Sequence, residues 1–450
     1  MHSTRESTVD ALTARVRGLM PRAHDDLAEL VSYRSVADAR QYPPEECAKT
    51  ARWVADACAD AGLTDTKLLT VADGSTAVYA ERPAPPGAPT VLLYCHYDVQ
   101  PPLSDTAWRT PPFELTERDG RWYGRGSADC KGNIVAHLTA LRALDGAPTV
   151  GVKFVAEGSE EQGTGGLEDH VAAHPDLLRA DEIVVADCGN ATLGKPTFTT
   201  SLRGTIVVVV TISTLDSEMH SGMFGGPAPD ALAALIRVLA TLRDGTGDTT
   251  VRGLAGDQKW SGVDYDEATF RRDAHVLDGV SLTGTGTVAD RLWARPAVTV
   301  LGIDAPKVVG SSAAIQPTAA ARINLRVPPG MDAHVALDAL RSHLVAATPW
   351  HARVEVAVEA VGQPFRANTS GPAYQAMSAA MRTAFGADPV ESGQGGSIPL
   401  CNVFADTYPG AEIMLLGVEE PACLIHAPNE SVSPDELSSM ALTEALYLSR

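Results

Sequence analysis

The sequence has no apolar run that could cross a membrane, because no stretch approaches the roughly 18 uninterrupted apolar residues of a spanning helix. Residues 1–20 also lack the apolar core of a secretory signal peptide, since charges are mixed into their helical period. We therefore expect a cytoplasmic protein.

Basic residues are too scarce for a protein that binds nucleic acid. The chain has 36 Lys and Arg against 56 Asp and Glu, which gives a formal net charge of −20. Such a charge repels nucleic acid and anionic membrane, so neither is expected as a partner. The seven cysteines are odd in number and lack CxxC spacing, which predicts reduced thiols. A dinucleotide-binding GxGxxG motif is missing as well, which excludes a nucleotide-dependent oxidoreductase.

The length and the hydrophobic pattern predict two domains. A chain of 450 residues exceeds what one hydrophobic core usually serves. From residue 91 to residue 186 strands and helices alternate, which is typical of a mostly parallel α/β sheet. After residue 203 the order of strands and helices favours an α+β sandwich inserted into the first domain. We assign residues 1–203 and 361–450 to the first domain and residues 204–360 to the second.

The stretch VLLYCHYDV, residues 91–99, is predicted to be a buried strand that ends in His96 and Asp98. Side chains alternate along a strand, so these two leave the same face at its carboxyl end, where open α/β sheets place their chemistry. One imidazole nitrogen could bind a metal while the carboxylate accepts the proton of the other. Taken alone, the pair could equally be a solvated strand end.

Four further groups of polar residues follow predicted strands or lie in the loops after them. A lone Asp in such a place is most often a helix cap or an ion-pair partner, and adjacent glutamates are usually solvated. Several such groups together, with two histidines, form a donor set suited to two Zn²⁺ or Mn²⁺ ions. The candidate ligands are His96, Asp129, Glu160 or Glu161, Asp187 and His426.

Glu160 and Glu161 cannot both face one point on an extended backbone. One of them could therefore bind a metal while the other takes a proton from a water molecule.

The motifs CHYDVQPP, YGRGSADCKGN, EGSEEQGTGGL, VVADCGN, HSGMFGG, GGSIP and LIHAPNE occur in this order over essentially the whole chain. In this they resemble the carnosinase-like dipeptidases, which belong to the di-metal metallopeptidase family of aminoacylase and carboxypeptidase G. The resemblance implies a zinc-peptidase-like catalytic domain with an inserted lid that also forms a homodimer. It also implies two divalent metal ions per chain, with Zn²⁺ as the first candidate and Mn²⁺ or Co²⁺ as alternatives.

The resemblance also assigns roles to single residues. It implies that His96 and Asp187 hold one metal, that Glu161 and His426 hold the other, and that Asp129 bridges them. Asp98 would orient His96, and Glu160 would be the general base. His220 would polarise the scissile carbonyl in the partner subunit's site. Three residues would bind the carboxylate of the substrate: Arg326, Gly396 and Ser397. Without the resemblance, Arg326 would be read as an outward-facing strand residue.

Three positions depart from the family pattern, although none removes a proposed ligand or the base. Cys130 stands where these dipeptidases often have a second Asp, Gln394 stands where a Glu is common, and Ala313-Ala314 replaces a turn that usually offers Asn or Thr. Cys95, Cys130 and Cys188 adjoin proposed ligands. Neighbours on a strand point to opposite faces, so we expect Cys95 and Cys188 to pack as small hydrophobic residues.

The sequence thus predicts a metal-dependent hydrolase that cleaves the amide bond of a dipeptide or another small substrate with a free carboxylate. The predicted mechanism uses a water between the two metals, activated by Glu160. The nearest alternative is an N-acyl-amino-acid deacylase with the same site. A metal-binding scaffold without turnover is a further alternative.

Overall fold

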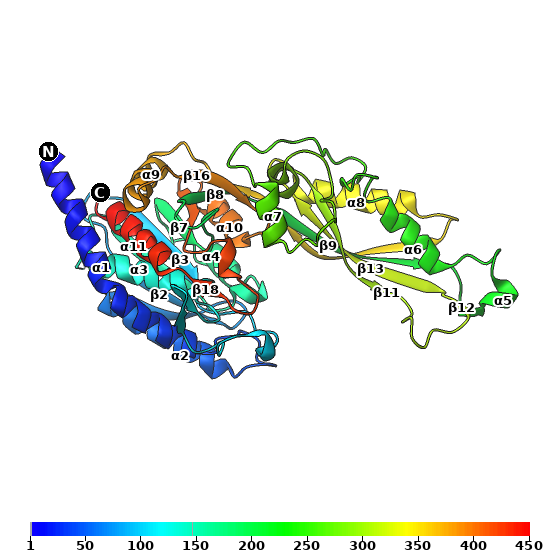
Figure 1. The fold of residues 1–450 in the computed structure, drawn as a ribbon, viewed down its shortest axis with the longest axis horizontal. Coiled ribbons are helices and arrows are strands. Elements are labelled where there is room, and N and C mark those ends of the chain that lie inside the picture. The colour runs from blue at the N-terminus through cyan, green and yellow to red at the C-terminus, as the bar shows by residue number, and fades with distance from the viewer. Residues whose placement is uncertain (1, 146) are drawn as a thin grey trace. The chain divides into compact units, whose positions relative to one another are not determined.

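A computed structural model describes residues 2–145 and 147–450, which form two compact units (Figure 1). The first unit comprises the chain up to Thr200, Ala367–Ser392 and Pro399–Arg450, and the second comprises Ser201–Arg366 and Gly393–Ile398. The sequence placed the boundaries at 203/204 and 360/361 and left residues 393–398 in the first domain. That segment groups with the second unit, where the backbone N–H of Arg203 donates to the carbonyl of Gln394 at 3.3 Å.

Four parallel strands form the centre of the sheet in the first unit. Their order is β6 (Gly151–Glu157), β3 (Thr90–His96), β7 (Glu182–Ala186) and β17 (Glu412–Leu416). Antiparallel strands flank them, with β2 (Thr76–Arg82) and β1 (Asp65–Thr70) beside β6, and β8 (Thr197–Leu202) beside β17. β16 (Val390–Gln394) pairs with β8. The predicted mostly parallel α/β sheet is confirmed.

Helices cover both faces of this sheet because its central strands are apolar on both sides. Val91, Leu93 and Cys95 of β3 belong to the same hydrophobic core as the first group of helices. On the opposite face Tyr94 contacts Phe404 of α10, with the ring centroids 6.4 Å apart. The first group is α1 (His2–Ser32), α2 (Pro44–Asp60), α3 (Lys131–Ala143), α9 (Pro372–Phe385) and α11 (Pro434–Leu448), and α4 (Gly166–Ala173) packs on α10 (Pro399–Thr407).

The second unit is a four-stranded antiparallel sheet with helices α6 (Ala231–Ala240) and α8 (Ala333–Ala347) packed against it (Figure 1). Buried and half-buried residues alternate strictly along β9, so one face of the sheet carries the core. The strand order is β11 (Ala297–Asp304), β13 (Thr318–Val327), β9 (Gly204–Ser213) and β14 (Arg353–Gly362). The expected α+β sandwich is confirmed.

Several short elements have no clear pattern in the sequence. In the first unit β4 (Thr116–Arg118), β5 (Arg121–Tyr123) and β18 (Ser431–Val432) form a small sheet. In the second unit β10 (Met219–His220) pairs with β12 (Ala314–Ile315), and α5 (Ser221–Phe224) follows β10 directly. The remaining elements are β15 (Phe365–Arg366), α7 (Glu267–Asp273), the 3₁₀ turns Asp105–Ala107, Glu160–Gln162 and Pro421–Cys423, and the π-helical turn Asp290–Ala294.

Candidate metal centre

The four central parallel strands bring all five proposed metal ligands to one edge of the sheet of the first unit. Adjacent parallel strands end at the same edge, which is why ligands far apart in the sequence meet there. His96 ends β3, Asp187 follows β7, Glu161 lies in the turn after β6, and His426 lies in the loop after β17. Asp129 stands two residues before α3, which follows the long loop after β3.

Asp129 occupies the middle of this group, with each of its two carboxylate oxygens facing a different histidine. Its Oδ1 lies 2.9 Å from Nε2 of His96, and its Oδ2 lies 2.9 Å from Nε2 of His426. Oδ1 of Asp187 lies 3.1 Å from Nε2 of His96, and Oε2 of Glu161 lies 3.2 Å from Nε2 of His426. The chain thus forms two half-sites that share one carboxylate.

This donor set fits a pair of divalent metal ions. Imidazole nitrogens and carboxylate oxygens are the ligands that Zn²⁺ and Mn²⁺ prefer, and donor atoms from Asp129, Glu161 and His426 lie within 4.8 Å of one another. Oε1 of Glu161 is buried without a hydrogen-bond partner among the described residues. Hydrogen bonds to Asp129 and Glu161 raise the pKa of His426 to about 11, so this imidazole is surrounded by groups that favour a positive charge.

Asp98 contacts both His96 and the turn that carries Glu160 and Glu161. Its carboxylate is fully buried and lies 3.4 Å from Nδ1 of His96, which also contacts the backbone carbonyl of Asp98 at 3.1 Å. The same carboxylate accepts the backbone N–H groups of Glu160 at 3.2 Å and Glu161 at 3.1 Å. Asp98 therefore orients one histidine and also fixes the turn that carries the two glutamates.

Glu160 and Glu161 lie on a 3₁₀ turn and not on the extended backbone that the sequence suggested. The tight turn lets the two neighbours diverge. Glu161 faces His426 and accepts a hydrogen bond from Gln100 at 2.7 Å. Burial, with the nearby Asp187 carboxylate, raises the pKa of Glu160 well above its usual range. A carboxyl group of that kind is suited to take up and return a proton.

Glu430 is a positioning residue that sequence reasoning missed. It is fully buried and accepts the backbone N–H groups of Gly126, Ala128 and Asp129 at 3.0–3.1 Å, while its carboxylate pairs with Arg125 at 2.7 Å. These bonds fix the loop that presents Asp129. The only available signal was the acid that ends the LIHAPNE motif.

The loop that presents His426 is conformationally strained. Leu424, His426 and Asn429 all have positive φ angles, of 54°, 62° and 68°. Residues other than glycine adopt positive φ angles at a cost in conformational free energy, and residues strained in this way cluster at functional sites in folded proteins.

Glu419 was also missed, although it lies against the proposed ligands. It follows β17 in an acidic pair at the same sheet edge, which was the available signal. Its carboxylate joins those of Asp129 and Asp187 in a group whose donor atoms lie within 4.8 Å of one another. Burial and the carboxylates of Asp129 and Asp187 raise the pKa of Glu419 well above its usual range.

The cysteines beside the ligands remain thiols. Cys95 packs in the hydrophobic core and Cys188 is fully buried, as expected for small apolar residues. Cys130 lies close to His96 and Asp187, but its Sγ donates to the carbonyl of Ala186 at 2.9 Å. Burial raises the pKa of the Cys130 thiol well above its usual range, which disfavours a thiolate ligand.

The second unit carries the remaining predicted residues. His220 is exposed at the start of α5, and its Nδ1 accepts the backbone N–H groups of Gly222 at 3.1 Å and Met223 at 3.2 Å. With Nδ1 as the acceptor, a neutral imidazole carries its proton on Nε2. Arg326 lies on β13 and is half-buried, and Gly396 and Ser397 are half-buried in the segment 393–398.

Arg203 lies near Arg326 and against the segment 393–398, and it was not recognised from the sequence. Only 7% of it is exposed, and its Nε has no hydrogen-bond partner among the described residues. Burial and the neighbouring charge of Arg326 lower the pKa of Arg203 to about 10. A Cβ atom on Gly395 would lie only 2.9 Å from Nη2 of Arg203, so the loop backbone approaches the guanidinium closely. Two neighbouring guanidinium groups without a carboxylate partner in the described chain are chemically suited to bind an anion.

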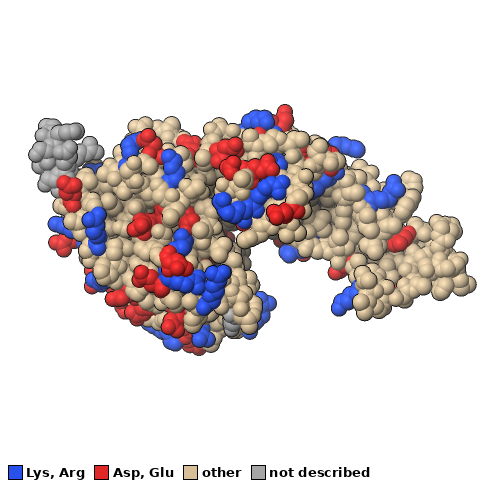
Figure 2. All heavy atoms as spheres, viewed as in Figure 1, with Lys and Arg blue, Asp and Glu red and all other residues tan. Residues whose placement is uncertain are grey.

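The surface agrees with the acidic composition. On the face shown in Figure 2, Lys and Arg lie among Asp and Glu without a continuous basic surface.

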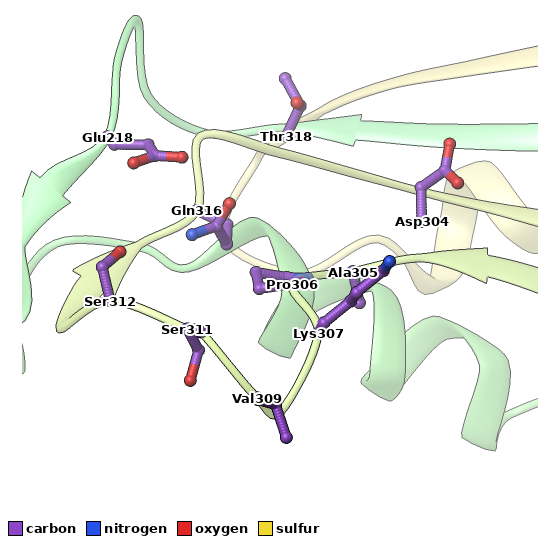
Figure 3. A pocket seen from close by; sticks show the side chains of 11 residues that line it. Glu218, Asp304, Ala305, Pro306, Lys307, Val309, Ser311, Ser312, Gln316 and Thr318 are labelled. Atoms are coloured by element: carbon purple, nitrogen blue, oxygen red, sulfur yellow. The ribbon is translucent and has the colours of Figure 1, made fainter.

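A polar hollow in the second unit, lined by Glu218, Asp304 and Lys307 among others, lies beside the β10–β12 pair that carries His220 (Figure 3). It contains none of the proposed catalytic residues. Within residues 2–145 and 147–450, no helix is long and apolar enough to cross a membrane.

Comparison with known proteins identifies the family. The model of peptidase family M20/M25/M40 matches residues 92–449. The chain is 43% identical over 435 residues to a cysteinylglycine-S-conjugate dipeptidase of Corynebacterium striatum, with 95% of each chain covered. It is 31% identical over 375 residues to a beta-Ala-His dipeptidase of Rattus norvegicus, with 79% of this chain and 76% of that protein covered. The structure of human carnosine dipeptidase 1 shares the fold, with a TM-score of 0.79 over 98% of both chains at 24% identity. The chain therefore belongs to peptidase family M20/M25/M40 and is a metal-dependent hydrolase.

Proposed function

We propose that this protein is a two-metal dipeptidase that cleaves the amide bond of a dipeptide with a free carboxylate. The observation that carries the proposal is the pair of half-sites around Asp129, with Glu160, whose carboxyl group has a raised pKa, beside them. Ligands shared through one carboxylate suit ions about 3.5–4 Å apart, which is the arrangement of two-metal hydrolases.

His96 and Asp187 would hold one ion, Glu161 and His426 the other, and Asp129 would contact both. Such ions polarise a carbonyl group and lower the pKa of a water molecule, and Zn²⁺ is the first candidate, with Mn²⁺ and Co²⁺ as alternatives.

Three side chains of the protein would handle protons and the developing charge. Glu160 accepts a proton from the attacking water and returns it to the leaving amine. Asp98 accepts a hydrogen bond from Nδ1 of His96, so that Nε2 is the nitrogen available to bind a metal ion. His220 presents an Nε2–H, which can donate to the oxygen of the scissile carbonyl.

The free carboxylate of the substrate would bind at the paired arginines. Arg203 and Arg326 lack a carboxylate partner within the described chain, and the glycine backbone of residues 393–398 lies against Arg203. Gly396 and Ser397 belong to that segment and would bind the same end of the substrate. A site built from two guanidinium groups favours a substrate with a free carboxylate over an amide.

The second unit, residues 204–360 in the sequence-based assignment, would be a lid through which two chains form a homodimer. Exposed apolar residues of this unit support that role, among them Leu301, Val308, Val309 and Met223. On the face shown in Figure 2, few charged side chains lie at the end of the unit around α5. We further propose that the protein works in the cytoplasm, since none of the seven cysteines, all of which are described, forms a disulfide.

A substrate screen tests the function. The purified protein, supplied with Zn²⁺, Mn²⁺ or Co²⁺, is assayed for release of free amino acids. The names of the relatives suggest S-substituted cysteinylglycines and beta-Ala-His as the first dipeptides, with N-acetyl amino acids as the comparison. We expect dipeptides to be cleaved at least about 10-fold faster than N-acetyl amino acids, and Glu160→Gln to lose about 10²–10⁴-fold in kcat. A preference for N-acetyl substrates would make the protein a deacylase. Absence of turnover with every metal would make it a scaffold.

A further inference from the structure

Glu419 faces the proposed two-ion centre from a sixth position that the assigned ligand set does not use. Its carboxylate oxygen lies within 4.8 Å of ligand oxygens of both Asp129 and Asp187. The residue is only 6% exposed, so solvent cannot compensate its charge.

The backbone of Glu419 is held firmly at this place. Its carbonyl accepts the N–H of Asn190 at 2.7 Å, and Glu419 forms a parallel bridge with Gly189, two residues after Asp187. A Cβ on Gly189 would lie only 2.1 Å from the carbonyl oxygen of Glu419, so the two loops are in direct contact. The backbone contacts between the loops that follow β7 and β17 therefore hold Glu419 next to Asp187.

The side chain of Glu419 has no structural partner that accounts for its burial. Its only hydrogen bond in the described chain is a long one from Asn133, at 3.5 Å, and no Lys or Arg of the described residues pairs with it. The neighbouring Glu420 shows what a structural carboxylate looks like here. It pairs with Arg121 at 2.6 Å and accepts the backbone N–H of Ala422 at 2.8 Å.

Three buried carboxylates within this distance repel one another unless a positive charge lies between them. Two divalent ions carry four positive charges, of which Asp129, Asp187 and Glu161 balance three. We propose that Glu419 supplies the fourth carboxylate of the two-ion centre, on the side of Asp129 and Asp187. The inference rests on the two-ion centre of the proposed function and adds a ligand to it.

An additional carboxylate changes the preference among metals. Carboxylate oxygens suit Mn²⁺, which takes more oxygen ligands, whereas Zn²⁺ is satisfied by four ligands that include imidazole. Glu419 should therefore strengthen the binding of Mn²⁺ more than that of Zn²⁺.

The test is a metal titration of the full-length protein, in which Glu419→Gln is compared with the parent. The protein is stripped of metal and titrated separately with Mn²⁺ and Zn²⁺, with free Mn²⁺ measured by electron paramagnetic resonance and free Zn²⁺ by a competing chromophoric chelator. Glu419→Gln should weaken one of the two Mn²⁺ sites by at least about 10–100-fold, which is the loss typical even of a partner that only supports a metal ligand. Its effect on Zn²⁺ should be smaller.

The matched control is Glu420→Gln, which changes the same type of residue at the next position. It removes the ion pair with Arg121, so it should lower thermal stability while leaving both metal affinities unchanged. Metal-free Glu419→Gln should unfold at the same temperature as the metal-free parent or a higher one, because the amide fills the same space and can carry no negative charge beside Asp129 and Asp187.

The outcomes separate this inference from the proposed function. If the parent binds two ions but Glu419→Gln binds both with parental affinity, Glu419 is not a ligand and the inference is wrong. If metal-free Glu419→Gln is strongly destabilised while its affinities are parental, the residue is structural and the inference is equally wrong. If the parent itself does not bind two ions, the two-ion centre of the proposed function fails.

Discussion

Asp98→Asn should impair catalysis more than its conservative chemistry suggests, because one carboxylate performs three tasks. The parent side chain contacts Nδ1 of His96 and accepts two backbone N–H groups, from Glu160 and Glu161, at 3.1–3.2 Å. Asparagine keeps one of these oxygens and replaces the other with an NH₂ group. Two donors then face each other in a buried place, where neither can turn to water.

The magnitude follows from the contacts that are lost. A hydrogen bond to a charged group contributes about 1.5–3 kcal/mol, and a buried donor left without a partner costs about 1–3 kcal/mol. A loss of about 3 kcal/mol corresponds to about a 10²-fold decrease in kcat/KM, since each 1.4 kcal/mol is a factor of ten. The decrease should fall mainly on kcat, because Asp98 orients the base and a ligand but does not contact the substrate in the proposed mechanism.

The assay is dipeptide hydrolysis under excess Mn²⁺, so that weaker metal binding does not disguise the effect on turnover. Asp73→Asn is the matched control. Asp73 accepts hydrogen bonds from Ser159 at 2.7 Å and Ser75 at 2.9 Å near the same turn, but contacts no proposed ligand. Its kcat should stay within about five-fold of the parent. Equal losses in both variants, or an Asp98→Asn enzyme within about three-fold of the parent, would refute the assigned role of Asp98.

Three further results are expected. If His220 acts in the partner subunit, mixing inactive His220→Ala and Glu160→Gln chains should restore about a quarter of parental activity, because about half of the dimers are mixed and each has one working site. Mixed dimers detected by mass spectrometry without recovered activity would contradict this. Arg203→Lys should raise KM about 10–100-fold with little change in kcat, because lysine keeps the charge but loses the guanidinium fork; an unchanged KM in steady-state kinetics would remove Arg203 from the substrate site. Burial lowers the pKa of Lys131 from 10.5 to about 7. Between pH 7 and pH 10.5, Lys131 is therefore neutral in the folded protein and takes up a proton on unfolding. The free energy of unfolding should then rise with pH, by up to about 1.4 kcal/mol per pH unit. Urea unfolding from pH 7.5 to 9.5 should show a steeper rise in the parent than in Lys131→Met, and identical slopes would refute the assignment.

The regular elements were predictable because each has a local pattern. The apolar run before His96 gave the central strand, and the β-branched run at residues 205–214 gave the long strand of the second unit. The proposed ligands were recognisable because parallel strands end at one edge, so polar residues after successive strands must converge. Local patterns are sufficient for these features.

The residues that hold the site in place were not predictable in the same way. Glu430 fixes the loop of Asp129 from about 300 positions further along the chain, and no local period marks such a contact. Arg203 and Glu419 stand out as buried charged side chains without an oppositely charged partner among the described residues, which is a property of the folded environment. The 3₁₀ turn of Glu160 and Glu161 depends on Asp98, so treating that segment as extended was wrong.

The late position of Glu430 and β17 has a consequence for synthesis on the ribosome. The first unit lacks an inner strand, between β7 and β8, until residues 412–416 have been made, and the loop of Asp129 lacks its carboxylate support until Glu430 has followed. A nascent chain therefore carries all residues of the second unit before it can assemble the proposed metal site. Truncated chains that end before Glu430 should neither retain metal nor cleave peptides, so we expect hydrolytic competence only after residue 430 has been made.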